Sequence, residues 1–365
     1  MPNKLRDPCR HKFSKAKYKT TNSKEYDQAL KNRGSLTIWF SDDAVSTWNM
    51  DPTLRQKRGG QTKYSDLSIE ICVTLSLIYK QRLRQNEGFV ESLIKLMNLD
   101  LATPDFTTIS RRSKFLKLKP FKRDSLESIV IAIDSTGLKI YGEREWQTEK
   151  YQHTKTKKSW RKLHIAIDEQ GFIVASDLTC HNVSDCAEVP VLLEQIETAI
   201  DTILADGAYD QVITYKAMED HKTSHSNGLK IKAAIPPNLG FRAEKPEDSM
   251  LRNDNIRILE QGRHHWQKET NYGRRAKVEN AMYRYKIIIG NKLKSRSIEN
   301  QKIESKIAVN ILNKRGRQVN CVSCFFHILH LSGKSIKNWF SASGQSLMGI
   351  VHFFLAFCKA KYTIL

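Results

Sequence analysis

The sequence predicts an α/β protein in which a mixed sheet, flanked by helices, follows an all-helical N-terminal region. Between about residues 35 and 118, apolar residues recur with the period of 3.6 that is typical of amphipathic helices. From residue 127 the pattern changes to short apolar runs bounded by turn residues, which predict strands. Further along the chain strands alternate with helices, an order typical of a sheet whose two faces are covered.

A basic, polar segment precedes the helical region. Residues 1–34 hold ten Lys and Arg residues against three acidic residues, and they show no apolar periodicity. A segment of this composition has too little apolar surface to fold by itself. We therefore expect residues 1–34 to form a flexible basic arm.

The helical region, residues 35–118, contains three amphipathic runs. They are SDLSIEICVTLSLIYKQRL (65–83), EGFVESLIKLMNL (87–99) and TPDFTTISRRSKFLKL (103–118). The third run begins with Thr-Pro-Asp, a strong helix start, and it carries Arg111 and Arg112. Three short helices, of which the last is cationic, are typical of helix-turn-helix DNA-binding regions, although a helical bundle with a charged surface has the same pattern.

The strand-rich part begins with SIVIAIDSTGLKIYG, which predicts two strands joined by a turn at Ser135–Gly137. KLHIAIDEQGFIVASDLTC predicts a second pair of strands around a turn at Asp168–Gly171. A helix over Asp185–Ala199, a buried strand in DTILAD with a helix after it, and a short strand in GLKIKAAIPP follow. Residues 238–270 are polar and predict no regular element, whereas residues 298–312 predict a last helix.

Two aspartates stand at the ends of predicted strands. Asp134 follows IVIAI and precedes Ser-Thr-Gly, while Asp206 follows TILA and precedes Gly-Ala. A carboxylate in this place projects from the sheet edge where α/β proteins bind ligands, and small neighbours leave room for a metal ion or a phosphate. The alternative is that each aspartate only caps a turn.

The segment YGRRAKVENAMYRYK, residues 272–286, predicts an amphipathic helix. Because successive residues of an α-helix are rotated by about 100°, Tyr272, Arg275, Glu279 and Lys286 lie along one side. The neighbouring face is apolar and consists of Val278, Met282, Tyr285 and Ile289. Taken alone, Glu279 reads as the acidic partner of Arg275 in an i,i+4 ion pair. Together with Asp134 and Asp206, it would instead complete a set of three carboxylates.

Charge and composition narrow the class of partner. The formal net charge is +21, with an isoelectric point near 9.6, and such an excess attracts polyanions, of which nucleic acid is the usual soluble one. The start of the chain has no apolar core of a signal peptide, and its seven cysteines form no disulfide framework, so we expect a cytoplasmic protein. The longest apolar stretch, Leu347–Cys358, is too short to span a bilayer, so we expect no membrane partner.

Three carboxylates and no convincing His/Cys set indicate a site for hard cations. Mg²⁺ prefers oxygen ligands and is commonly held by carboxylates together with substrate phosphate. Two such ions can activate an attacking oxygen and stabilise a leaving one in phosphodiester displacement. Three carboxylates shared between two ions suffice for that chemistry.

The motifs together resemble a known family. Tyr272-x-x-Arg275-x-x-x-Glu279, followed after six residues by Lys286, resembles the Y-R-E-K signature of bacterial insertion-sequence DDE transposases of the insertion sequence four/five superfamily. IAIDSTGLKIYGEREW resembles the first-aspartate block of that family, and TILADGAYD resembles the second. The resemblance covers roughly residues 35–315, including DFTTISRR, and residues 316–365 match no part of it and have the character of an aberrant tail.

The resemblance implies a fold, a reaction and a set of partners. An RNase H-like catalytic domain, residues 119–315, would bind two Mg²⁺ ions, which Mn²⁺ can replace, through Asp134, Asp206 and Glu279. The enzyme would cut double-stranded DNA at the terminal inverted repeats of the element and join the 3′-hydroxyl ends to target DNA. It would act as a homodimer on DNA. The resemblance implies that Tyr272, Arg275 and Lys286 contact DNA. For Arg111 and Arg112 of the helical region, the helix-turn-helix pattern, the basic arm and the net charge lead to the same expectation.

Other interpretations stay open or are set aside. The basic segment Tyr151–His164 is either part of the DNA path or a solvated hairpin. The Cys and His residues within 321–330 lack the spacing of a zinc finger. Packing explains Trp266 better than base stacking does. A DNA-binding protein without activity, such as a degenerate copy, and an RNase H-like nuclease without strand transfer are the alternative functions.

Overall fold

The computed structural model describes residues 24, 27–28, 31, 42–50, 62–118, 121, 127–140, 160–221, 231–237 and 249–331, with side chains up to residue 316. Residues 35–316 form one compact unit, and residues 1–34 with 317–365 form another. The described parts of the first unit contain the sheet and every residue proposed above for the site. Most of the predicted arm, most of segment 151–164 and the tail after residue 331 lie outside the described residues.

The helical region forms the predicted helices with shifted ends. They are α3 (Asp66–Ile78), α4 (Leu83–Leu96) and α5 (Phe106–Ser113), and a short helix outside the three predicted runs, α2 (Asp42–Ser46), precedes them. Side chains set two of the starts, because Ser65 accepts a hydrogen bond from the Ser68 N–H and Asp105 accepts from the N–H groups of Thr107 and Thr108. The third predicted run therefore becomes helical after Asp105, which caps it, and not at Thr103.

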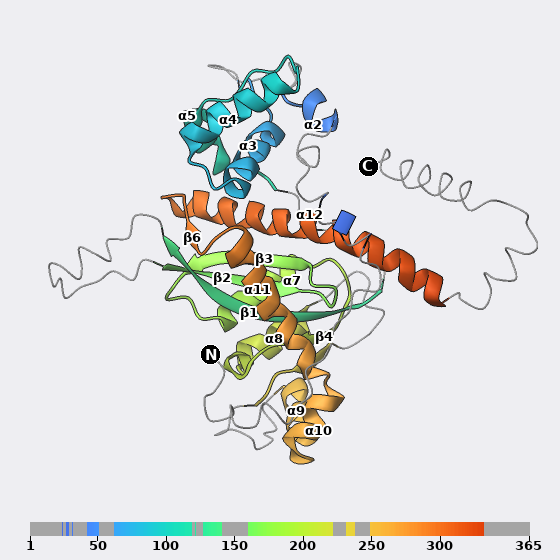
Figure 1. Cartoon of the computed structure of the whole chain (residues 1–365). Helices are drawn as coiled ribbons and strands as arrows, with labels where there is room; N and C mark the ends of the chain where they lie inside the picture. The colour runs from blue at the N-terminus through green and yellow to red at the C-terminus, as the bar shows by residue number, and fades with distance from the viewer. Residues whose placement is uncertain are drawn as a thin grey trace, which may run out of the picture. The chain divides into compact units, whose positions relative to one another are not determined.

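The sheet contains six described strands. They are β1 (Ile129–Ile140), β2 (Trp160–Ile167), β3 (Ile173–Cys180), β4 (Ile200–Leu204), β5 (Lys232–Ala234) and β6 (Lys292–Leu293). The order is β3-β2-β1-β4-β5, with β6 beside β1 (Figure 1). β1 is antiparallel to β2 and parallel to β4, and β2 is antiparallel to β3. Three antiparallel strands followed by two parallel ones confirm the expected mixed, RNase H-like sheet.

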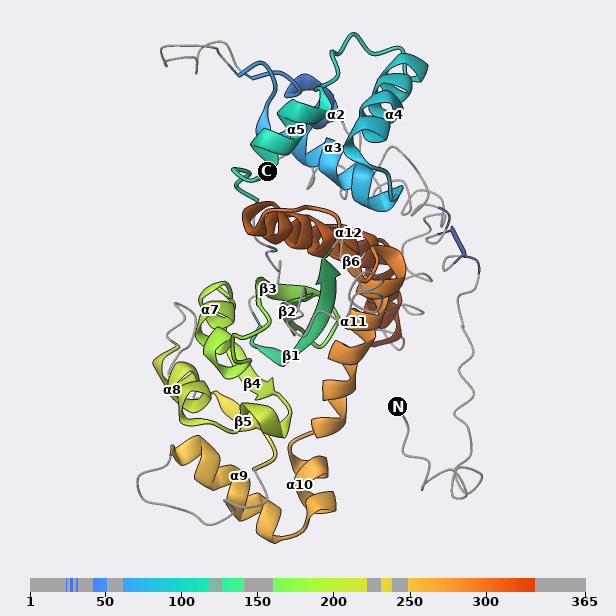
Figure 2. The same ribbon diagram turned by 90° about the vertical axis from the view of Figure 1, so that its left-hand side faces the viewer.

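Helices cover both faces of the sheet (Figure 2). The short helix α7 (Val189–Glu194) and α8 (Val212–Asp220) cover one face, where Ile131 and Ile203 are buried. α11 (Ala276–Ile288) and the part of α12 (Ile298–Leu331) up to residue 316 cover the other, and their apolar residues share one hydrophobic cluster with α3, α4 and α5. Alternate residues of β1 thus enter two different cores, as expected for a strand that is buried on both sides.

The structure differs from the predictions for residues 135–137 and for residues 238–270. β1 continues through the expected turn at Ser135–Gly137, because these residues pair with His164, Leu163 and Lys162 of β2. Asp134 therefore lies within a strand and not at its end. The stretch 238–270 contains α9 (Met250–Glu260) and α10 (Arg263–Glu269), so the absence of a regular element there was a wrong prediction.

The helix predicted over 185–199 is shorter than expected. It consists of a 3-10 turn, η4 (Cys186–Glu188), and α7, and its carboxyl end lies at Gln195. Two further 3-10 turns, η5 (Gly207–Tyr209) and η6 (Tyr272–Arg275), precede α8 and α11. In the described part of the chain no helix is long and apolar enough to cross a membrane.

Candidate active site

Strand register brings the two aspartates to the same level of the sheet. β1 and β4 run parallel, and Ala132 pairs with Leu204. Asp134 and Asp206 each lie two residues further along, on neighbouring chain segments about 5 Å apart. Because side chains two residues apart share a face of a strand, both carboxylates lie on the α11 side of the sheet. Asp206 also caps η5, since its Oδ1 accepts a hydrogen bond of 2.9 Å from the Ala208 N–H.

Gly207, next to Asp206, lies against the backbone that follows β5. A Cβ atom at Gly207 would lie 3.2 Å from the carbonyl oxygen of Pro236. The glycine therefore allows the backbone after β4 to approach the segment after β5. Its role in the fold is close packing, which holds Asp206 at the end of the strand.

Helix α11 carries Glu279 to the same side. It packs against β1 and β2, with Val278, Ala281, Met282 and Tyr285 buried, as the apolar face of the sequence predicts. Arg284 fixes the helix to the β2–β3 turn, because its Nη2 donates a hydrogen bond of 2.6 Å to the carbonyl oxygen of Gly171. Glu279 lies in the first turn of α11, next to η6, which contacts β1 and β4.

Arg275 joins Asp134 and Glu279. Its Nη1 lies 3.3 Å from Asp134 Oδ2, and its Nη2 lies 2.6 Å from Glu279 Oε1. The i,i+4 ion pair expected from the sequence is thus present, and the same guanidinium reaches across to the sheet. The side chains of Arg275 and Asp134 are about one fifth exposed, whereas that of Glu279 is 58% exposed. The cluster therefore lies at the surface end of the α11–sheet interface.

The electrostatics of Asp134 reflect an excess of negative charge. Burial raises the pKa of its carboxyl group, and the Asp206 and Glu279 carboxylates raise it further, while the Ser135 N–H and the Arg275 guanidinium oppose these effects. Burial alone would lower the pKa of Arg275, but neighbouring Tyr272, Glu279, Asp134 and Asp206 raise it. One guanidinium thus faces three carboxylates.

These residues fit a hard divalent cation by type. Three carboxylates supply the oxygen ligands that Mg²⁺ prefers, and their mutual repulsion is relieved by positive charge. Among the described residues, however, no group of three or more His, Cys, Asp or Glu side chains is arranged to hold a metal ion. In this structure the guanidinium of Arg275 is the positive charge that contacts both Asp134 and Glu279.

Behind Arg275 lies a chain of buried side chains. The Tyr272 ring centroid lies 5.9 Å from Arg275 Cζ and 4.8 Å from the ring centroid of Trp266. Trp266 is fully buried, and its Nε1 donates a hydrogen bond of 3.0 Å to Asn255 Oδ1. Asn255 Nδ2 donates one of 2.7 Å to the carbonyl oxygen of Ala233 in β5. Packing is therefore the role of Trp266 here, as expected.

The remaining predicted DNA-binding residues lie in different surroundings. Lys286 is exposed on α11, two turns beyond Glu279. Arg111 is exposed on α5, whereas Arg112 is directed into the protein. The Arg112 guanidinium donates hydrogen bonds to the carbonyl oxygen of Tyr64 and to Asp66 Oδ1, the second at 2.5 Å. Arg112 thus links the start of α3 to the end of α5.

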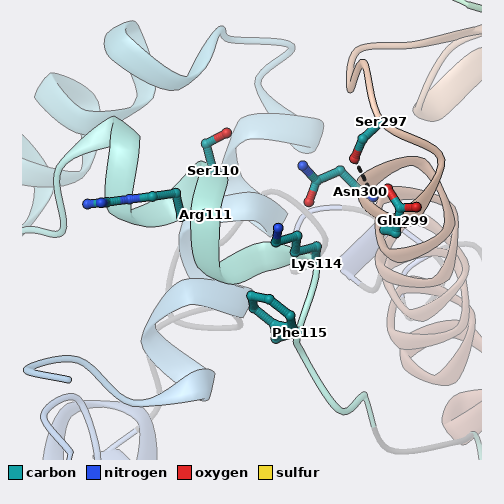
Figure 3. Close-up of a pocket in the computed structure, with 7 residues that line it drawn as sticks. All are labelled: Ser110, Arg111, Lys114, Phe115, Ser297, Glu299 and Asn300. Carbon is teal, nitrogen blue, oxygen red and sulfur yellow. Dashed lines mark hydrogen bonds between the residues drawn. The ribbon is translucent and has the colours of Figure 1, made fainter. Parts of the chain in front are cut away.

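A cleft of about 450 Å³ separates α5 from the start of α12 (Figure 3). Figure 3 shows Lys114 and Asn300 between the two helices, with Arg111 pointing away from α12 on the other side of α5. Ser113 Oγ donates a hydrogen bond of 3.0 Å to Asn300 Oδ1, which joins α5 to α12 beside the cleft. The cationic surface of α5 is therefore divided, and Arg111 faces away from the α12 contact.

A second charged cluster lies on the opposite face of the sheet. His164 is fully buried, with Nε2 at 2.8 Å from Thr179 Oγ1 and Nδ1 at 3.6 Å from Asp185 Oδ1. Burial lowers the pKa of His164 to about 4, against an opposite effect of Asp185. Lys162 Nζ lies 3.2 Å from Asp185 Oδ1 and donates a hydrogen bond of 2.8 Å to the Val183 carbonyl oxygen. These contacts fit the structural role expected for His164 and Asp185.

Sequence patterns missed several residues that support the site. Asn255, the hydrogen-bond partner of Trp266, lies in α9, where no apolar period indicates a helix. Tyr209 has a buried hydroxyl group, whose pKa is raised by burial and by the charges of Asp185, Asp134 and Asp206. A tyrosine directly after the Asp-Gly-Ala of the second aspartate block was the only signal for it.

Comparisons with known proteins point to one family. A family model described as "Transposase DDE domain" matches residues 125–313, more than half of the chain, and a second with the same description matches residues 31–143. Among solved structures, the chain is similar to the "Drosophila P element transposase strand transfer complex", at 11% identity and a TM-score of 0.25. The match covers 82% of this chain and 66% of that one, slightly under two thirds. A TM-score this low carries no argument, so the family assignment rests on the two family models.

Proposed function

Because the chain belongs to the family of DDE transposases, we propose that it cuts DNA at the ends of a mobile element and joins the freed ends to target DNA. Asp134, Asp206 and Glu279 are the proposed ligands of two Mg²⁺ ions, which Mn²⁺ can replace. When bound, such ions activate the attacking oxygen and stabilise the leaving oxygen of a phosphodiester displacement. The reaction is hydrolysis first, followed by attack of the 3′-hydroxyl end on a target phosphodiester.

One observation carries this proposal. Asp134 and Glu279, from distant parts of the chain, both contact Arg275, and Asp206 lies near enough to raise the pKa of both Asp134 and Arg275. A protein that only bound DNA would have no use for a concentration of carboxylates in a chain of net charge +21, because they repel phosphates. The excess of acid in one place supports metal-dependent chemistry.

The proposed DNA contacts extend along α11 and η6. Arg275 provides a forked donor, Lys286 a point charge and Tyr272 a hydroxyl on a rigid ring, and each suits a backbone phosphate. With Glu279 they make up the Y-R-E-K signature, so we place the chain in the insertion sequence four/five superfamily. Arg111 of α5, which is exposed, is the proposed contact of the helical region.

The proposed organisation follows the same reasoning. Residues 1–34 are a basic arm, residues 35–118 a DNA-binding region, residues 119–315 the catalytic domain and residues 316–365 an unmatched tail. Since a transposase brings two element ends together, we propose that the active form is a homodimer on DNA in the bacterial cytoplasm, associated with the nucleoid. Light scattering of the protein with and without end DNA measures the oligomeric state. A monomer on end DNA contradicts the proposed homodimer.

The test is a cleavage and joining assay with the full chain, Mg²⁺ and duplexes taken from the DNA that flanks the coding sequence. Asp134→Asn and Glu279→Gln should each reduce cleavage by about a thousandfold or more, as expected when a metal-ligating charge is lost, while end binding stays within a few fold. Asp201→Asn is the matched control, because Asp201 lies on β4 but pairs with Lys232 of β5, whose Nζ lies 3.7 Å from Asp201 Oδ1.

Each outcome of this assay separates the alternatives. Cleavage by the Asp134→Asn protein at the rate of the Asp201→Asn protein contradicts the metal-ligand assignment. Cleavage without joined products indicates an RNase H-like nuclease. Binding of the ends without any cleavage by the unmodified chain indicates a DNA-binding protein, such as a degenerate copy.

A further inference from the structure

The contact of Arg275 with two acids raises a question about the order of binding events. Both oxygens of Asp134 are engaged, since Oδ1 accepts a hydrogen bond of 2.8 Å from the Ser135 N–H and Oδ2 lies 3.3 Å from Arg275 Nη1. Glu279 Oε1 lies 2.6 Å from the same guanidinium. A cation that uses Asp134 Oδ2 and Glu279 Oε1 together must therefore replace the guanidinium. Arg275 and the cation compete for the same atoms.

The Arg275 guanidinium contacts the carboxylates of Asp134 and Glu279, and its Cζ lies 5.9 Å from the Tyr272 ring centroid. Arg275 lies at the junction of η6 and α11, and the Tyr272 ring beside it packs on buried Trp266. The backbone of Arg275 is thus well supported, while its side chain keeps one fifth of its surface exposed. Breaking the two carboxylate contacts frees the guanidinium to turn outward without unfolding the helix.

Charge balance favours such an exchange. Three carboxylates face one guanidinium in this cluster, so Arg275 neutralises only part of the negative charge. A divalent cation supplies twice the charge of Arg275 in the same place. The released guanidinium then needs a new anion, and a DNA phosphate is the anion that the proposed reaction brings.

Resting on the proposed function, we propose that Arg275 is an internal counter-cation, which joins Asp134 to Glu279 without metal and moves to a DNA phosphate when metal binds. Metal binding and DNA binding then favour each other through one side chain. Coupling of this kind is reciprocal, so DNA must raise the affinity for metal by the same factor by which metal raises the affinity for DNA. A protein free of DNA keeps its acids paired and holds metal less tightly.

The first test measures Mn²⁺ binding to the full chain without DNA, by the electron paramagnetic resonance signal of the free ion. Arg275→Gln should bind Mn²⁺ roughly three- to tenfold more tightly than the unmodified chain, because two partly exposed ion pairs no longer compete. Arg275→Lys should fall between the two, since an ammonium keeps the charge but cannot bridge both acids as a fork. Far-ultraviolet circular dichroism confirms that each variant is folded.

Arg274→Gln is the matched control. Arg274 is the exposed neighbour of Arg275 in η6, and its loss removes the same charge from almost the same place. It should tighten Mn²⁺ binding by less than about twofold, because a screened, exposed charge acts weakly at a distance. Equal effects of Arg274→Gln and Arg275→Gln, or weaker binding by Arg275→Gln, would overturn the proposal.

A further variant separates this inference from the proposed function itself. Asp134→Asn must weaken Mn²⁺ binding; if it does not, the metal site of the proposed function fails, whatever Arg275 does. If Asp134→Asn weakens binding but Arg275→Gln leaves it unchanged, only the counter-cation role fails.

The second test repeats the Mn²⁺ titration with a short DNA duplex present. In the unmodified chain the duplex should tighten Mn²⁺ binding several fold, and in Arg275→Gln this gain should disappear. A gain of the same size in both proteins would overturn the transfer of Arg275 to the phosphate.

Discussion

Two arginine–carboxylate clusters lie near the second aspartate block, and they differ in their balance of charge and in their exposure to solvent. Arg252 of α9 contacts Asp210, with Nε at 3.1 Å from Oδ1, and the two side chains are only 9% and 2% exposed. The Tyr215 hydroxyl donates a further hydrogen bond of 2.9 Å to the same carboxylate oxygen. This cluster is an ion pair inside the protein.

The cluster of Arg275 has the opposite balance. Its guanidinium faces the carboxylates of Asp134, Asp206 and Glu279 near the surface, and Glu279 is more than half exposed. Burial of a matched pair makes an interaction that holds the fold and is costly to break. An unmatched, accessible cluster contributes little to stability, because water and salt screen it, but it can take up another cation. Asp210 and Asp206 lie four residues apart and serve these different purposes.

The largest expected effect concerns the buried pair. Arg252→Met leaves the Asp210 carboxylate buried without its cation, which should lower the free energy of unfolding by about 3–5 kcal/mol. Urea-induced unfolding, followed by circular dichroism, measures this change. Arg275→Met is the matched comparison and should change the free energy of unfolding by about 1 kcal/mol or less, because its ion pairs are partly exposed. Similar losses in the two variants would contradict the view that the buried Arg252–Asp210 pair stabilises the fold more than the contacts of Arg275 do.

The next effect concerns the histidine on the opposite face of the sheet. Burial lowers the pKa of His164 from 6.5 to about 4, so the unfolded chain binds its proton more readily than the folded chain does. The contribution of neutral His164 to the free energy of unfolding is fully present above about pH 6.5, and it is lost as the pH falls towards 4. The loss amounts to about 3 kcal/mol at most, since one unit of pKa corresponds to about 1.4 kcal/mol.

Urea unfolding at several pH values between 7 and 4 measures this contribution. In His164→Gln the fall in stability over this range should be smaller than in the unmodified chain. The charged neighbours Lys162, Asp185 and Asp177 remain in that variant, so the difference between the two curves isolates the histidine. Replacement of His264, an exposed histidine of α10, should leave the fall unchanged. Identical curves for His164→Gln and the unmodified chain contradict the expectation.

The smallest effect separates two neighbouring arginines of α5. Arg111→Gln should weaken DNA binding and reduce the slope of log affinity against log salt by about one unit, because one phosphate contact is lost. Arg112→Lys should instead lower the free energy of unfolding by about 1 kcal/mol, since the ammonium cannot contact both Tyr64 and Asp66 as the guanidinium does. DNA-end binding measured at several salt concentrations gives the affinity and the salt slope of both variants, and urea unfolding gives their free energies of unfolding. A larger loss of DNA affinity in Arg112→Lys than in Arg111→Gln contradicts this division.

Local sequence patterns predicted the parts of the fold that depend on local physics. Short apolar runs bounded by turn residues predicted β2, β3 and β4, and the apolar face of 278–289 predicted the buried side of α11. The pattern failed where the determinant was a partner far away in sequence. The residues at 135–137 look like a turn, but they remain extended because β2 pairs with them. α9 and α10 have no long apolar stripe, because their core centres on one buried tryptophan that bonds to Asn255.

For the site, the sequence by itself determined which residue types are present and on which elements they lie. An aspartate after IVIAI, an aspartate after TILA and a glutamate in a cationic helix are readable without a structure, as is the i,i+4 pair of Arg275 with Glu279. Only the tertiary structure decided that Arg275 also reaches Asp134, and that Arg112 faces inward while Arg111 faces out. Spacing fixes neighbours along one element, but contacts between elements depend on how the sheet and helices pack, which no local pattern records.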